Sequence, residues 1–97
     1  MRIVARRTLV EFSAKHKGAK CHLDAWWKMA EAADWATPQD VRNMLPKASI
    51  VAGNRVVFDI CGGSYRLVVK FNYEYRMGYI RFVGTHSAYD KTDVTTV

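Results

Sequence analysis

The chain has 97 residues, 49% of them apolar and 25% charged, which excludes an intrinsically disordered chain and predicts one folded domain over residues 1–97. Fifteen Lys and Arg against nine Asp and Glu give a net charge of +6, which favours acidic or polyanionic partners without naming one. No run approaches the roughly 20 apolar residues of a membrane span, and no signal peptide is recognisable, so we expect a cytoplasmic protein with no membrane partner.

A short strand and a helix are predicted at the start of the chain. Residues 1–5 contain adjacent β-branched side chains and are expected to form a first strand at a sheet edge. Thr8 and Glu11 have the spacing of a capping box, which predicts a helix over residues 8–16. Gly18 is expected to end this helix, because glycine readily adopts the left-handed conformation that follows a last turn.

A second helix is predicted over residues 20–34, where apolar side chains recur at intervals of three and four. The apolar positions on its inner face are Leu23, Trp26, Trp27, Ala30 and Ala33. Trp26 and Trp27 are adjacent in the sequence and cannot both point fully inward. We therefore expect one of them to face outward, where it can contact a partner.

A third, short helix has the clearest local signal in the first half of the chain. Thr37 is a good N-cap, Pro38 suits the first helical position, and Asp40 lies near the positive end of the helix dipole. The helix is predicted to end before Pro46. Helices therefore fill the first half of the chain after its opening strand.

Beyond Pro46 the apolar pattern alternates, which predicts strands. Residues 50–51 fit a short strand, and residues 55–61 fit a longer one that is followed by a hairpin loop at residues 62–64. The side chains predicted to lie in the core from the longer strand are Val56, Phe58 and Ile60. The second half of the chain therefore predicts a mainly antiparallel sheet, and the chain as a whole predicts an α+β fold.

The strand over residues 65–72 carries two charges on one face. Its alternate apolar residues are Tyr65, Leu67, Val69 and Phe71. Arg66 and Lys70 must then lie together on the opposite face, about 13 Å apart. Two charges at that separation can follow a chain of phosphates but cannot both hold one phosphate without moving.

The last strand is predicted over residues 77–83, with Ile80 and Phe82 in the core. Tyr79, Arg81 and Val83 would then lie on the other face, the one that holds Arg66 and Lys70. Gly84 is expected to bend the chain and to present Thr85, His86 and Tyr89 at the end of the sheet.

A basic sheet face is the resulting candidate site. Its members are Arg55, Arg66, Lys70, Tyr79 and Arg81. Arginine interleaved with aromatic rings suits single-stranded RNA, although an ordinary solvated sheet face explains the pattern equally well. His86 adds a group that can exchange a proton near neutral pH, and arginine can stabilise charge that develops on a phosphate.

Other sites have weaker support. Cys21 and His22 supply two zinc ligands where a structural site needs four, so we expect free thiols, no metal and no cofactor. A phosphate-binding glycine loop and a nucleophile elbow are both missing from the sequence. A helix-turn-helix is conceivable in the first half, but the helix over residues 20–34 lacks an obvious base-reading face.

The sequence resembles the HigB toxins, a family of ribosome-associated mRNA interferases of the RelE-like superfamily. The matching segments are RIVARRTLVEF, AWW, ATPQDVR, ASIV, NRVVFDI, SYRLVVKFNY, YIRFVGTH and AYDKTDV, which together cover nearly the whole chain. The resemblance implies a RelE-like domain with an N-terminal strand and two to three helices packed on an antiparallel sheet. It also implies a HigA-like helix-turn-helix antitoxin as a partner, and an open face that engages mRNA on the ribosome.

The resemblance further implies RNA cleavage without a metal, in which the 2′-OH attacks the adjacent phosphate. The tyrosine-arginine pair of RelE-like toxins falls on Tyr65 and Arg66. A basic position after a glycine falls on His86, and Tyr89 matches a nearby aromatic residue. Where relatives often carry lysines for proton transfer, this chain has Asp59, so the general base is open between two other residues, Lys70 and His86.

The expected catalytic residues are Arg66, Lys70, Arg81, His86 and Tyr89. A non-catalytic module that binds RNA or the ribosome through the same face remains an alternative function. A protein-interaction domain with an acidic target is a third, and it explains the charge but not the corner at His86.

Overall fold

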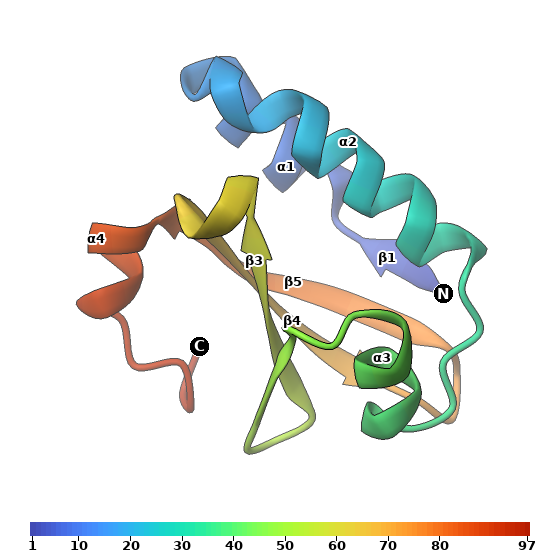
Figure 1. Cartoon of the computed structure of the whole chain (residues 1–97). Helices are drawn as coiled ribbons and strands as arrows, with labels where there is room; N and C mark the ends of the chain where they lie inside the picture. Colours follow the sequence, from blue (N-terminus) through green and yellow to red (C-terminus); the bar gives the residue numbers. More distant parts are fainter.

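A five-stranded sheet with the strand order β1-β5-β4-β3-β2 carries the fold in the computed structural model, which describes all 97 residues (Figure 1). Only β1 runs parallel to its neighbour, and the other pairs are antiparallel. The strands are β1 (Arg2–Val4), β2 (Ser49–Val51), β3 (Arg55–Ile60), β4 (Tyr65–Asn72) and β5 (Met77–Thr85). The helices are α1 (Arg6–Lys15), α2 (Lys17–Ala32), α3 (Pro38–Met44) and α4 (His86–Asp90), with a 3-10 turn, η1, at Cys61–Gly63. The predicted α+β class is therefore confirmed.

The boundary between α1 and α2 differs from the sequence prediction. α1 begins at Arg6 without a side-chain cap, and Glu11 pairs with Arg7 instead of reaching back to the helix start. The chain breaks at His16, whose ring stacks on Phe12. Gly18 does not end α1 but lies in the first turn of α2. Long-range packing sets this break, because Tyr65 of β4 contacts the rings of both Phe12 and His16.

The start of α3 agrees with the prediction. The Thr37 hydroxyl accepts a hydrogen bond from the Asp40 backbone N–H, and the Asp40 carboxylate accepts one from the Thr37 N–H. Pro38 is the first helical residue, and the helix ends at Met44, before Pro46. These groups are all local in sequence, which is why the sequence alone predicts them.

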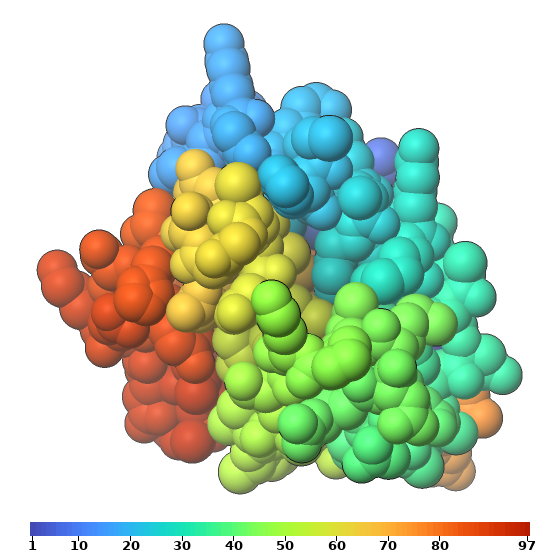
Figure 2. Space-filling view, in the orientation of Figure 1, coloured from blue at the N-terminus to red at the C-terminus, as the bar shows by residue number.

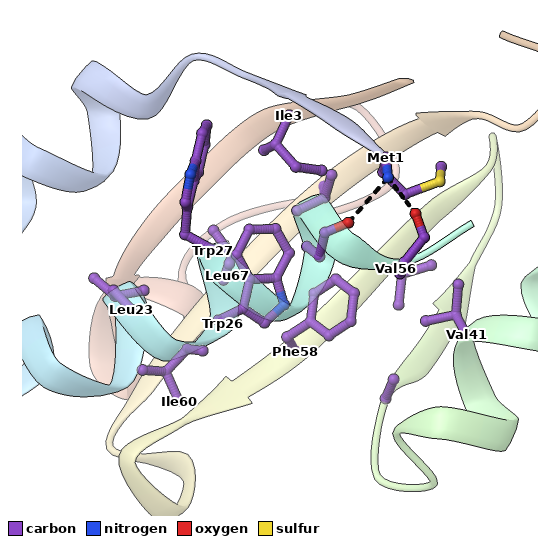
Figure 3. Close-up of a cluster of buried hydrophobic side chains, with 14 of the residues drawn as sticks. Met1, Ile3, Leu23, Trp26, Trp27, Val41, Val56, Phe58, Ile60 and Leu67 are labelled. Atoms are coloured by element: carbon purple, nitrogen blue, oxygen red, sulfur yellow. Dashed lines mark hydrogen bonds between the residues drawn. The ribbon is translucent and has the colours of Figure 1, made fainter. Parts of the chain in front are cut away.

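The main core lies between α2 and the sheet, and it buries both adjacent tryptophans (Figure 3). Trp26 is 6% exposed and meets Phe58 edge to face, with ring centroids 5.2 Å apart. Trp27 is 8% exposed, and the guanidinium of Arg6 lies 5.4 Å from its ring centroid. The expectation that one of them faces outward is therefore wrong, because the start of α1 covers the second ring.

The β3–β4 hairpin has the predicted faces. Ile60 pairs with Tyr65 across the loop, and the buried inner residues are Val56, Phe58, Ile60, Leu67, Val69 and Phe71. The backbone has positive φ at Cys61, Gly62 and Gly63, which explains the glycine pair in this loop.

A bulge in β5 changes the faces predicted for the last strand. Val68 pairs with Phe82 while Val69 pairs with Ile80, so Arg81 has no partner of its own. Beyond the bulge the alternation is reversed: Phe82 lies on the face of Arg66, and Val83 packs against the core. The sequence prediction for these two residues is therefore wrong.

Gly84 does not bend the chain, because β5 continues to Thr85. A Cβ at position 84 would lie 2.6 Å from Cζ of Phe82, so glycine gives room to that ring. The turn comes at Thr85, whose hydroxyl accepts a hydrogen bond from the Ala88 N–H and caps the short helix α4.

Helix α4 and the C-terminal segment lie on the opposite side of the sheet from α1 and α2 (Figure 1). On that side Val57 and Val68 are almost completely buried, although neither belongs to the main core. The face that the sequence presents as open is therefore partly covered by the chain itself. None of the helices has the length and apolar character needed to cross a membrane.

Candidate nucleic-acid interface

Cross-strand pairing places the predicted basic residues along one face of the sheet. Arg66 lies opposite Asp59 on β3 and Gly84 on β5, while Lys70 lies opposite Arg55 and Tyr79. Paired residues in an antiparallel sheet point to the same face. The face therefore has two ends, one at Arg66 and one at Lys70.

Arg66 is held from three directions. Its Nη1 donates a 2.6 Å hydrogen bond to the Gly63 carbonyl, and its Nε lies 3.3 Å from Oδ1 of Asp59. The guanidinium also lies over the ring of Tyr89, 5.6 Å from the centroid. A guanidinium has five N–H donors, so these contacts leave donors free for a further acceptor. The side chain is only 18% exposed, which indicates a fixed guanidinium and not a mobile surface charge.

Gly63 is part of this arrangement. A Cβ at this position would lie 3.0 Å from Nη1 of Arg66, and φ is +97°. Both the close approach and the backbone conformation favour glycine. The hairpin loop therefore fixes the arginine as well as the strand register.

His86 begins α4 at the same end of the face. Its backbone N–H donates a 3.0 Å hydrogen bond to the Ser64 carbonyl, which ties the end of β5 to the hairpin loop. Its Nδ1 lies 3.7 Å from Oδ2 of Asp90, one helical turn on. A carboxylate beside one ring nitrogen orients an imidazole and leaves Nε2 available for proton transfer.

Tyr89 connects the two elements at this end. Its ring centroid lies 6.4 Å from that of Phe82 on β5, and the other contact of the ring is with the Arg66 guanidinium. Helix α4 thus brings Tyr89 against the arginine, and His86 begins the same helix at this end of the sheet. The sequence placed both residues mainly by resemblance.

The other end of the face forms an open pocket of about 600 Å³. Lys70, Tyr79 and Arg81 line it, so three more of the predicted residues share one surface. Tyr73 also lines the pocket, and its hydroxyl is buried without a hydrogen-bond partner. Burial raises the pKa of Tyr73 to about 12. Sequence reasoning assigned no role to Tyr73, because its position in the turn after β4 gives no signal of burial.

Arg55 differs from the other members of the predicted face. It is 9% exposed, its Nε donates a 2.8 Å hydrogen bond to the Val97 carbonyl, and its Nη1 donates one to the Ala52 carbonyl. The guanidinium therefore holds the C-terminal segment on the sheet. It is not displayed as a surface contact for RNA.

Metal-ligating side chains do not gather at this face, since no group of three or more His, Cys, Asp or Glu residues lies close enough together to hold a metal ion. Both cysteines are free thiols, Cys21 exposed and Cys61 partly buried.

The fold and this face define a small α+β domain with a fixed arginine at the end of a basic sheet surface. Residues 19–92 match the family model of the HigB toxins, described as the RelE-like toxic component of a toxin-antitoxin system, and the chain belongs to this family. The chain is also 22% identical over 93 residues to the mRNA interferase HigB of Escherichia coli O6:H1, strain CFT073. That alignment covers 94% of this chain and 90% of the relative.

Proposed function

We propose that this protein is a cytoplasmic, ribosome-associated endoribonuclease toxin that cleaves translated mRNA without a metal and is neutralised by a HigA-like antitoxin. The observation that carries the proposal is the fixed guanidinium of Arg66, which lies over Tyr89 of α4, the helix that His86 begins. Membership of a toxin family and the name of the Escherichia coli relative, mRNA interferase, support the same function.

The proposed reaction uses the RNA's own 2′-OH as the nucleophile. The 2′-oxygen forms a bond to the adjacent phosphorus, the bond from phosphorus to the 5′-oxygen breaks, and a cyclic phosphate and a free 5′-OH result. A base must accept the 2′-OH proton and an acid must protonate the departing 5′-oxygen. Negative charge builds up on the phosphate oxygens, so a preorganised cation nearby lowers the barrier.

Arg66 is the proposed phosphate-stabilising residue. Its contacts with Gly63, Asp59 and Tyr89 fix the guanidinium before RNA binds, and its remaining donors are free to bind a phosphate oxygen. His86 is the proposed proton-transfer residue, with Asp90 orienting its ring. Tyr89, which lies against Arg66, is a further group that can act in proton transfer.

Lys70 and Arg81 are proposed to guide the flanking strand. Lys70 lies four residues along β4 from Arg66, or about 13 Å, which is too far to act on the same phosphate. With the ring of Tyr79 in the same pocket, these residues can bind a neighbouring phosphate and stack on a base. Because His86 begins the helix whose Tyr89 lies against Arg66, His86 is favoured over Lys70 for proton transfer.

The test is to induce the protein in cells and map the 5′ ends of translated messages. Wild type should arrest growth and produce new ends, and Arg66→Ala and His86→Ala should each remove both effects. Arg7→Ala and His22→Ala are matched controls, because both side chains are exposed on helices away from the face, and both should remain toxic.

A non-catalytic module that blocks translation through the same face is the second candidate, favoured by the Asp59 carboxylate that offsets the charge of Arg66. It predicts growth arrest with intact messages. Full toxicity in both site variants would overturn the assignment of the site to either function.

A further inference from the structure

A second pocket lies on the helix side of the sheet, where α2, the connection between α3 and β2, and the end of β3 meet. Its volume is about 470 Å³, within the range of pockets that bind a ligand or a large side chain. Trp26 and Phe58 line it from α2 and β3, and Leu45, Pro46 and Ala48 line it from the connection. Figure 2 shows the surface hollowed where these segments meet.

Trp26 is the largest apolar side chain in the lining of this pocket. The residue is 94% buried, since its exposed fraction is 6%, and its indole Nε1 has no hydrogen-bond partner. Figure 3 shows the indole nitrogen on the side of the ring toward Phe58. A contact with an aromatic ring is a weak substitute for an oxygen acceptor. Trp35 has an unpaired indole N–H too, but it does not line the pocket.

The strand beside the pocket has an unpaired outer edge. β2 pairs only with the first three residues of β3, Arg55 to Val57. From Phe58 to Ile60, β3 has a neighbour on the β4 side alone. An unpaired strand edge can accept an extended peptide as an additional strand.

The charges at the pocket favour an acidic occupant. Lys47 lines it, is exposed and makes no ion pair. Asp59, the other charged residue of the lining, is already paired with Arg66. Lys47 is therefore the uncompensated charge at this site, in a chain whose net charge is +6.

We propose that this pocket is the docking site for an extended, acidic segment of the cognate antitoxin. An apolar side chain of that segment fills the space over Trp26 and Phe58, its backbone pairs with the free edge of β3 from Phe58 to Ile60, and a carboxylate pairs with Lys47. The family to which the chain belongs is defined by its place in a toxin-antitoxin system, so a protein partner of this kind is expected. The proposal does not depend on the chemistry at Arg66.

The position of the pocket has a consequence for neutralisation. A segment docked there lies against Asp59, whose carboxylate holds the Arg66 guanidinium from the other face of the sheet. The docked segment can therefore contact Asp59, which positions Arg66, without covering the RNA-binding face.

The test uses the full-length toxin and the small protein encoded by the adjoining reading frame, once that protein is shown to neutralise toxicity. Titration with ¹⁵N-labelled toxin follows the three indole N–H signals, assigned through single Trp→Phe variants. The Trp26 signal should shift on binding, because Trp26 lines the pocket, while the Trp35 signal should stay in place as an internal control.

Affinity measurements complete the test. Lys47→Glu and Trp26→Phe should each weaken the complex by roughly ten-fold, because the first replaces attraction by repulsion and the second removes apolar surface that the segment covers. Arg42→Glu is the matched charge reversal on the exposed surface of α3, outside the pocket, and should change affinity less than two-fold. Lys47→Glu keeps the test valid even if Trp26→Phe impairs folding, because Lys47 is exposed.

An unchanged Trp26 signal in the complex, or Lys47→Glu binding as tightly as wild type, would overturn the proposal. RNA cleavage by Lys47→Glu should equal that of wild type, because Lys47 lies outside the residues proposed to act on RNA. If the wild-type protein proves not to cleave RNA, the proposed function is wrong but the docking proposal is unaffected. The two proposals can therefore fail independently.

Discussion

Asp59 and Arg66 face each other across β3 and β4, with Oδ1 of the aspartate 3.3 Å from Nε of the arginine. The same arginine donates to the Gly63 carbonyl and lies over Tyr89, so the aspartate is one of three groups that fix it. The aspartate also cancels part of the positive charge that an RNA phosphate would meet. The aspartate therefore has two opposed effects. It fixes the position of the Arg66 guanidinium, and it lowers the positive potential that an RNA phosphate meets there.

Replacing Asp59 by Asn should separate these effects. The amide keeps the size of the carboxylate, and Gly63 and Tyr89 still hold the guanidinium, while the charge that offsets it is removed. Affinity for a single-stranded RNA should rise about two- to five-fold at low salt. If Arg66 gains one full phosphate contact, the slope of log Kobs against log salt should become steeper by about 0.7. Weaker binding in Asp59→Asn would show that positioning by the carboxylate matters more than its charge.

Arg66→Lys should lower the rate of mRNA cleavage by about 10- to 100-fold, because one ammonium cannot reproduce a planar group that binds a carbonyl and a carboxylate and lies over a ring. Cleavage in a translation extract measures the rate. Arg81→Lys is the control, since this exposed arginine is proposed to act as a point charge, and the rate should fall less than about three-fold. Equal losses in the two variants would contradict a special role for the Arg66 guanidinium.

The dependence of the cleavage rate on pH should identify the proton-transfer residue. His86→Gln keeps a polar side chain at the start of α4 but cannot exchange a proton, so one limb of the wild-type profile should disappear. His22→Gln, at an exposed position on α2, should leave the profile unchanged. A profile that keeps both limbs in His86→Gln, and loses one in Tyr89→Phe, would assign the role to the tyrosine.

Local signals explain which parts of the fold the sequence could predict. The start of α3 depends on Thr37, Pro38 and Asp40, which all lie within four residues. The faces of β3 and β4 follow from simple alternation with a short loop. The break at His16 has no local signal, because the ring of His16 packs against Tyr65, almost fifty residues away in the chain.

The same distinction between local and long-range interactions explains which parts of the candidate site can be predicted from the sequence. Arg66 and Lys70 share a strand, so their common face could be read from the sequence. The bulge at Arg81 could not, because it depends on which residues of β4 pair with β5, and it reversed the faces of Phe82 and Val83. The burial of Arg55 depends on a hydrogen bond to Val97, forty-two residues away in the chain.

Leu67→Ala should test the core that supports the face. Leu67 is completely buried on β4, on the opposite side of the strand from Arg66, so its truncation leaves a cavity under the site. The free energy of unfolding should fall by about 2 to 5 kcal/mol, as measured by urea denaturation. Val10→Ala removes an exposed side chain on α1 and should change it by less than about 0.5 kcal/mol. A loss below about 1 kcal/mol in Leu67→Ala would mean that the sheet repacks around the missing side chain.

Tyr73 should make the protein less stable at alkaline pH. Burial raises its pKa to about 12 from an ordinary value of 10.0, so between these pH values the folded state holds a proton that the unfolded state releases. The free energy of unfolding therefore falls as pH rises from 10 to 12. The ring is only partly buried, and solvent screening limits this loss to about 1 to 2 kcal/mol.

The comparison with Tyr73→Phe isolates this effect. The hydroxyl is buried without a partner, so its removal should leave stability at pH 8 unchanged or slightly higher. The free energy of unfolding of both proteins should be measured by urea denaturation from pH 8 to pH 11.5. In the difference between the two values, the contributions of the other tyrosines and of the lysines cancel. The difference in stability should grow in favour of Tyr73→Phe above pH 10, and parallel curves would mean that the hydroxyl is hydrated in solution.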